Sequence, residues 1–298
     1  MKEKNMLFVF NPRAGKAKIK NKLCDIVDIF TKAGYRVTLY PTQYPGDAVR
    51  EVTEKEEYYD ILVCSGGDGT LDETVSGMMH SSKKIPIGYI PAGSTNDFAS
   101  SLRIPKDMIK AAQTVVEGKP YACDIGEINE ESFVYIAAFG IFTEVSYATS
   151  QDVKNVLGHM AYILEGVKRI PSIKSYHLKI TYGDKVIENE FIFGIVTNSV
   201  SVGGFKRITG KYVELNDGEF EVTLIKKPSN PLELNMIMAS LVNRNINTDY
   251  MYCFKTDNIV FESEKEIPWT TDGEFGGSHK KVHIRDRKQA IEIIVPSK

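Results

Sequence analysis

A run of apolar residues leads into a glycine-rich turn in the segment ILVCSGGDGT, residues 61–70. The apolar run is typical of a buried strand, and a helical pattern over Leu71–Met79 follows the turn. Glycine lets the backbone approach a phosphate closely, and the helix behind it offers unpaired N–H groups and the positive end of its dipole. The segment therefore predicts a strand, a phosphate-binding turn and a helix. A glycine turn capped by Asp68, with no ligand, is the alternative.

The same alternation of strand and helix runs through the first part of the chain. We expect strands at 6–10, 35–40, 60–64 and 85–90, and helices at 16–33, 71–79, 97–102 and 106–117, with a further helix opened by Gly46 and by Asp47 as its N-cap. This order predicts a three-layer α/β domain, in which a parallel sheet carries helices on its faces. Ligands of such sheets bind beyond the carboxyl ends of the strands.

Strands dominate from about Tyr121 onward. We expect them at 121–128, 132–139, 174–182, 186–198 and 219–227, with four more between 250 and 295 and helices at 155–169 and 231–242. Strands joined by Gly, Asp and Asn turns are typical of an antiparallel β-sandwich. We therefore predict two domains, residues 1–125 and 126–288, with a last strand at 289–298 returning to the first. The cleft between two domains is the expected active site.

The composition limits the binding partners and the cellular location that we expect for this protein. The 37 basic and 39 acidic residues give a formal net charge of −2, which does not favour nucleic acid as a partner. The four cysteines form no C-x-x-C pair, as expected of reduced thiols in a cytoplasmic protein. The apolar run Met6–Phe10 is shorter than the roughly seven residues of a signal-peptide core. No later stretch reaches the roughly twenty residues of a membrane span, so we expect peripheral membrane contact.

Two further loops follow expected strands. The loop NPRAGK, residues 11–16, carries Arg13 and Lys16, which could neutralise phosphate charge or form an ordinary solvated helix start. The loop PAGSTND, residues 91–97, offers hydroxyls, an amide and a carboxylate, or a helix cap. Neither the P-loop pattern nor G-x-G-x-x-G fits, so the glycine turn at 66–70 is a different phosphate loop. Asp68 beside a phosphate requires a cation, which predicts Mg²⁺ or a water bound to it.

Four motifs occur in a fixed order: N-P-x-x-G at 11–15, G-G-D-G-T at 66–70, P-x-G-S-x-N-D-F-A at 91–99 and D-G-E-F-G-G at 272–277. With them the chain resembles the diacylglycerol kinase catalytic family, and in particular its soluble bacterial lipid kinases, over nearly its whole length. G-G-D-G-T alone is shared with NAD kinases, whereas the set of four favours lipid kinases. The first domain also resembles the fold of NAD kinases and 6-phosphofructokinases.

The resemblance implies ATP and Mg²⁺ as cofactors and assigns residues to each. ATP is expected against Asn11, Pro12, Arg13, Ala14, Gly15, Lys16, Thr42, Gly66, Gly67, Asp68, Gly69, Thr70, Leu71, Asp72, Ser94 and Asn96. Catalytic Mg²⁺ is expected at Asp68, Asp97 and Asp124, partly through water. A second, structural cation is expected at Glu214, Asp217 and Glu219, where a plain Asn-Asp-Gly hairpin turn is the alternative. The base is expected at Asp272 or Glu274, and the choice between them stays open.

These expectations describe an ATP-dependent lipid kinase that is cytoplasmic and peripherally bound to the membrane surface where its lipid substrate lies. Diacylglycerol, giving phosphatidic acid, is the first candidate acceptor. The alternatives are another lipid alcohol such as phosphatidylglycerol or a sphingoid base, NAD, and a nucleotide-binding regulator without turnover. Residues 198–205 could line an acyl groove, and residues 167–174 mix basic and apolar side chains as a membrane contact would. An exposed sandwich edge allows a homodimer.

Overall fold

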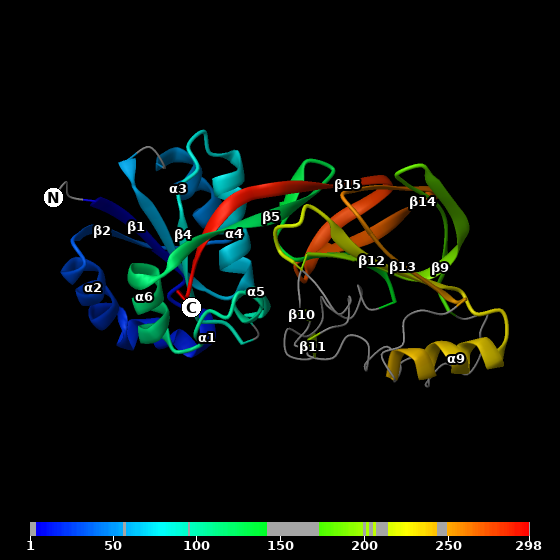
Figure 1. Ribbon diagram of the computed structural model, residues 1–298, viewed down its shortest axis with the longest axis horizontal. Coiled ribbons are helices and arrows are strands. Elements are labelled where there is room, and N and C mark those ends of the chain that lie inside the picture. The colour runs from blue at the N-terminus through cyan, green and yellow to red at the C-terminus, as the bar shows by residue number, and fades with distance from the viewer. Residues whose placement is uncertain are drawn as a thin grey trace. The chain divides into compact units, whose positions relative to one another are not determined.

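The computed structural model of the chain describes residues 4–55, 58–94, 96–141, 173–198, 201–202, 205–206, 214–242 and 249–297. Two compact units make up the chain: unit 1 is Met1–Ile125 with Lys288–Lys298, and unit 2 is Gly126–Arg287 (Figure 1). The helix expected at 155–169 lies outside the described residues, as do most of the segment 167–174 and half of the segment 198–205. Among the described residues, no helix has the length and apolar character needed to cross a bilayer.

Unit 1 is built on a parallel sheet. Its strands are β1 (Lys4–Phe10), β2 (Tyr35–Pro41), β3 (Ile61–Gly66), β4 (Ile87–Pro91) and the last part of β15 (Glu274–Val295). They lie in the order β2-β1-β3-β4-β15, and β5 (Lys119–Ile128) pairs with β15. β3 is buried along its whole length, as its apolar run predicts. The chain continues to opposite sides of the sheet after the adjacent strands β1 and β3, and the carboxyl ends of two such strands are where these sheets bind ligands.

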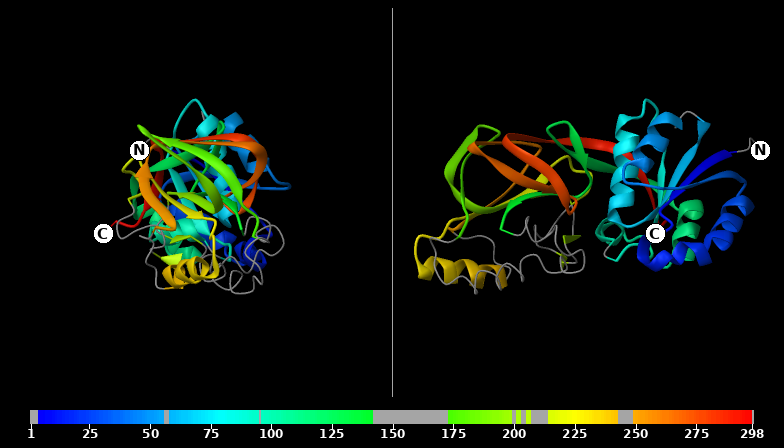
Figure 2. Two further views of the ribbon diagram at one scale, coloured as in Figure 1. Left: turned by 90° about the vertical axis from the view of Figure 1, so that its right-hand side faces the viewer. Right: turned by 180° about the vertical axis from the view of Figure 1, so that it is seen from behind.

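Helices cover both faces of this sheet. The longer ones are α2 (Leu23–Lys32), α3 (Asp47–Lys55), α4 (Asp68–His80) and α6 (Met108–Glu117), and the short ones are α1 (Ala14–Ala17), η1 (Lys18–Asn21) and α5 (Asp97–Ser101). Helices α3 and α4 pack together on one face, and α2 and α6 pack together on the other (Figures 1 and 2). The predicted three-layer α/β fold is confirmed.

The single helix expected over 16–33 is wrong. The structure divides it into α1, η1 and α2, because Ala17 adopts a left-handed backbone with φ of 58°. A right-handed helix cannot continue through a left-handed residue. Gly15 is also left-handed, with φ of 53°, and a Cβ atom there would lie 1.7 Å from the carbonyl oxygen of Ala92. The break therefore brings the first loop against the loop that follows β4.

Unit 2 is antiparallel. Its strands are β6 (Glu131–Phe133), β7 (Ile136–Gly140), β8 (Tyr176–Tyr182), β9 (Lys185–Thr197), β12 (Phe220–Lys226), β13 (Met251–Thr256), β14 (Asn258–Thr271) and the first part of β15, with the short pair β10 (Ser201–Val202) and β11 (Phe205–Lys206). β8 pairs with both β9 and β14, and β7 pairs with the same two strands, so the sheet folds back on itself. This arrangement confirms the predicted sandwich. The strand expected over 132–139 is interrupted at Val134 and Tyr135.

Aromatic side chains fill the core of unit 2. Phe139, Phe261 and Trp269 contact one another, with ring centroids 4.9–5.9 Å apart. On the other face of the sheet, α9 (Pro231–Val242) contributes Leu234 and Ile237 to a second buried cluster. Large apolar side chains on alternating strand positions thus hold unit 2 together from both faces of its sheet.

Candidate nucleotide site and catalytic segment

The loops that follow β1, β2, β3 and β4 are bonded to one another in unit 1. The Asn11 N–H donates to the Ser65 carbonyl at 2.9 Å, and the Ala92 N–H donates to the Gly66 carbonyl at 2.7 Å. The Thr42 N–H donates to the carbonyl of Phe10 at 2.9 Å. The backbone ladder of the sheet therefore continues past the strand ends and brings the predicted loops to one edge.

Two glycines let the second and third loops touch through their backbones. A Cβ atom on Gly93 would lie 2.6 Å from the Cα atom of Gly67, a separation that real Cβ atoms do not reach. The pair explains why glycines stand in both motifs, because any side chain at Gly93 would push the loops apart. The glycines thus bring backbone N–H groups of two loops close together.

Asp68 joins the same two loops through a side chain. Its Oδ2 atom accepts a hydrogen bond from the Asn96 N–H at 2.9 Å. Asn96 is left-handed, with φ of 53°, and its amide both accepts from the Gly93 N–H at 2.9 Å and donates to the Gly93 carbonyl at 2.8 Å. The Asn96 side chain, expected at ATP, therefore folds its own loop, a use of Asn that suits a left-handed position.

Of the carboxylates expected at Mg²⁺, Asp97 and Asp124 are buried and Asp68 is half-buried. Burial raises the pKa of Tyr89, and the nearby charges of Asp68 and Asp97 raise it further. Asp124 has no exposed surface, and its Oδ1 atom accepts from the Gln289 N–H at 2.6 Å. Within the described residues, no three His, Cys, Asp or Glu side chains form a group that could hold a metal directly.

Mg²⁺ usually keeps several water ligands and binds through one or two carboxylates together with substrate phosphates. Asp68 and Asp97, which share the surroundings of Tyr89, fit that chemistry. The assignment of Asp68, Asp97 and Asp124 to catalytic Mg²⁺ stays a prediction.

Helix α4 begins inside the G-G-D-G-T loop and has no side-chain cap. Its N-cap residue is Gly67, whose carbonyl accepts from the N–H groups of Thr70 and Leu71 at 3.1 and 3.2 Å. An uncapped helix N-terminus suits an anionic ligand. In the first loop, the Asn11 Oδ1 atom accepts from the Arg13 N–H at 2.9 Å, and the Arg13 side chain is exposed.

The two acidic residues expected as the base, Asp272 and Glu274, lie at the turn between β14 and β15 in unit 2. The Asp272 carboxylate is buried and accepts three backbone N–H groups, from Val134 at 2.5 Å and from Tyr135 and Ile136 at 3.0 Å. The Tyr135 hydroxyl donates to the Asp272 carbonyl at 3.1 Å. Asp272 therefore fastens this turn to the segment between β6 and β7. Glu274, two residues later, is exposed at the start of β15.

Asp217, one of the three residues expected at the structural cation, contacts a lysine. The Lys255 ammonium lies 2.6 Å from the Asp217 carboxylate and 3.1 Å from that of Glu221. Glu214 and Glu219 are exposed, and the Glu219 N–H donates to Asp217, as in a simple Asx turn. Glu221 and Lys255 are directly opposed on β12 and β13. A positive charge is thus supplied from the chain itself, and the cation at this turn stays a prediction.

Unit 1 has a parallel sheet with glycine-rich loops at its carboxyl edge, and an antiparallel β domain follows it in the chain. This combination is that of α/β kinases of the NAD kinase-like class. Residues 5–128 match the model of the diacylglycerol kinase catalytic domain. Residues 136–295 match that of the YegS C-terminal NAD kinase beta sandwich-like domain.

Full-length relatives agree with these matches. A Bacillus subtilis (strain 168) protein named diacylglycerol kinase is 33% identical over 97% of this chain and 98% of its own. One from Staphylococcus saprophyticus is 32% identical over 99% of this chain and 96% of its own. A crystal structure of a diacylglycerol kinase from Bacillus anthracis str. Sterne shares the fold, with a TM-score of 0.77 at 22% identity over 99% of this chain and 98% of its own. The chain belongs to the diacylglycerol kinase catalytic family, a family of lipid kinases.

Replacing Asp272 should destabilise unit 2, because three backbone N–H groups would lose their acceptor. We expect Asp272→Ala to lower the free energy of unfolding by about 1–3 kcal/mol. Glu274→Ala, at an exposed position, is the matched control and should change it by less than about 0.5 kcal/mol. The measurement is urea unfolding followed by the emission of Trp269, the single tryptophan, which is buried in unit 2. Equal effects of the two variants would contradict the structural role of Asp272.

Glu221 should make the stability of the protein depend on pH. Burial raises the pKa of Glu221 from 4.5 to about 7 despite Lys255. The folded state then holds the proton more tightly than the unfolded state, so this stabilisation is complete below pH 4.5 and lost as pH rises through about 7. We expect Glu221→Gln to flatten the fall in Tm over that window, whereas Glu219→Gln should leave it unchanged. Parallel Tm curves for wild type and Glu221→Gln would show that the carboxyl does not titrate there.

Proposed function

We propose that this protein transfers the γ-phosphoryl group of ATP to the hydroxyl of a membrane lipid, with diacylglycerol as acceptor and phosphatidic acid as product. The observation that carries the proposal is the bonding of the loops at 11–16, 66–72 and 91–97 to one another around the uncapped start of α4. Membership of a lipid kinase family supports the lipid hydroxyl as acceptor.

The phosphates of ATP would lie against the first and second loops. Among the described side chains and helix ends, the N-terminus of α4 and the Arg13 guanidinium offer positive charge there, because Arg13 is exposed and α4 has no side-chain cap. Thr42 and Ser94 would add hydroxyls from neighbouring loops. Bound Mg²⁺, held by Asp68 and Asp97 and partly through water, would neutralise charge on the transferred phosphate.

Proton removal from the acceptor falls to Glu274 in this proposal. The acceptor oxygen forms a bond to the γ-phosphorus, the bond from that phosphorus to the ADP oxygen breaks, and the hydroxyl proton passes to the Glu274 carboxylate. Asp272 is less suited, since its carboxylate already accepts three backbone N–H groups. Its role is to fix the turn that carries Glu274.

The acceptor can be tested with labelled ATP. Full-length protein with Mg²⁺ should transfer the label to diacylglycerol in mixed micelles, and EDTA should abolish the transfer. Phosphatidylglycerol, a sphingoid base and NAD are offered in parallel. Labelling of another lipid alone would change the acceptor, and labelling of NAD alone would overturn the proposal. Nucleotide binding without transfer to any acceptor would indicate a regulator.

Replacing the proposed base should slow the chemical step and leave ATP binding intact. We expect Glu274→Gln to lower kcat by roughly 10²–10⁴-fold, the usual contribution of a positioned base. Glu266→Gln, an exposed glutamate on β14, is the control and should keep the wild-type rate. The measurements are kcat and the Kd of a non-hydrolysable ATP analogue. A Glu274→Gln enzyme with wild-type kcat would exclude Glu274 as the base.

A further inference from the structure

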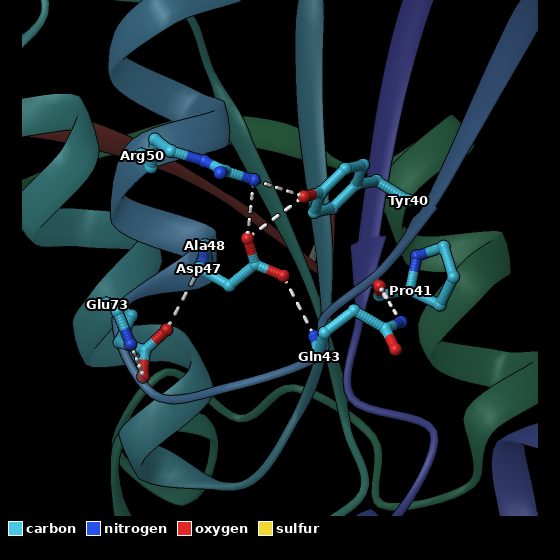
Figure 3. A network of polar contacts seen from close by, with 8 residues as sticks. Tyr40, Pro41, Gln43, Asp47, Ala48, Arg50 and Glu73 are labelled. Carbon is cyan, nitrogen blue, oxygen red and sulfur yellow. Dashed lines mark hydrogen bonds and ion pairs between the residues drawn. The ribbon is translucent and has the colours of Figure 1, made fainter.

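The loop between β2 and α3 is held by the buried carboxylate of Asp47, which points from the start of α3 toward that preceding loop (Figure 3). Asp47 has no exposed surface, and its Oδ2 atom accepts from the Gln43 N–H at 2.8 Å. Its Oδ1 atom accepts from the Tyr40 hydroxyl at 2.9 Å and from the Arg50 guanidinium at 2.8 Å. The sequence predicts Asp47 as the N-cap of α3, but Asp47 is the first residue of that helix and its carboxylate bonds the preceding loop instead.

The N-terminus of α3 is capped from the neighbouring helix. Glu73 on α4 accepts from the Gly46 N–H at 2.9 Å through Oε1 and from the Ala48 N–H at 3.3 Å through Oε2. Both N–H groups belong to the first turn of α3 and its lead-in, where a helix lacks internal partners. A carboxylate in this place also interacts favourably with the positive end of the helix dipole. The Glu73 side chain therefore caps the N-terminus of α3, a role that a residue of the same segment usually has.

This cap connects two loops that the proposed function assigns to ATP. Glu73 lies in the second turn of the helix that begins at Asp68. It bonds Gly46 and Ala48 at the end of the segment that follows β2 and starts with Thr42. Thr42 in turn donates its N–H to Phe10, the last residue of β1. The two helices pack closely beside this cap, since a Cβ atom on Gly77 of α4 would lie 2.8 Å from Val52 of α3.

We infer that Glu73 is a positioning residue for the nucleotide. It holds the segment 42–48 in register with the G-G-D-G-T loop, so that Thr42 and the start of α4 present their groups to one ligand. The inference rests on the proposed function, because it takes ATP as that ligand. Glu73 acts through Gly46 and Ala48, and its removal should weaken nucleotide binding while the chemistry of the acceptor is unchanged.

The test compares Glu73→Gln with Glu54→Gln, which changes an exposed glutamate on α3. We expect Glu73→Gln to raise the Kd of a non-hydrolysable ATP analogue and the KM for ATP about tenfold, the change that 1.4 kcal/mol produces. The KM for the lipid acceptor should stay within about twofold of wild type, since a factor of two is under 0.5 kcal/mol. Amide exchange at 42–48 should become faster in Glu73→Gln alone.

Each outcome has one meaning. A wild-type protein that does not bind the analogue would overturn the proposed function and the nucleotide role of Glu73 together. Wild-type binding with equal Kd values in the two variants would overturn the inference alone, even if Glu73→Gln lowers the Tm. Should Glu73→Gln fail to fold, Glu73→Asp keeps the charge on a shorter side chain, and it must still show faster exchange at 42–48 and weaker ATP binding.

Discussion

Unit 1 depends on a backbone contact between two loops that have no side chains at the point of contact. Gly93 approaches Gly67 so closely that a Cβ atom would lie 2.6 Å from its Cα atom, and the Ala92 N–H bonds the Gly66 carbonyl beside it. With this contact formed, Asp68 reaches the Asn96 N–H and the start of α4 remains without a side-chain cap. A larger residue at Gly93 would separate the loops and remove each of these consequences.

The fold was predictable where physical signals are local. Apolar runs such as Ile61–Cys64 and the turns between them were sufficient to predict a parallel α/β domain followed by a sandwich, because strand and helix periods differ. The break at Ala17 was not predictable, since it lies beside the close approach of Gly15 to Ala92, two residues far apart in the sequence. Helical propensity cannot anticipate a constraint that a distant loop imposes.

The candidate site, like the fold, was predictable from the sequence only where its signals are local. The glycine loops were visible as motifs, but the partners of Asp272 lie 136–138 residues earlier in the chain and carry no side-chain signal, because they are backbone N–H groups. For that reason the sequence left Asp272 and Glu274 equivalent. Burial separates them, since one carboxylate is used to hold a turn and the other is exposed. Glu221 and Lys255 were missed because their pairing needs the register of β12 and β13.

Carboxylates in this protein repeatedly accept backbone N–H groups. Asp47 binds Gln43, Glu73 binds the start of α3, and Asp124 binds Gln289. An ionised carboxylate forms stronger hydrogen bonds to N–H groups than a neutral acceptor does, which helps each contact to offset the entropy lost in ordering a loop. Helix α3 receives such a cap from Glu73, whereas α4, which begins in the G-G-D-G-T loop, has none from a side chain. The two neighbouring helices therefore differ in how their first N–H groups are bonded: Glu73 of another helix accepts from those at the start of α3, whereas the start of α4 carries Asp68 in its first turn and has no side-chain cap.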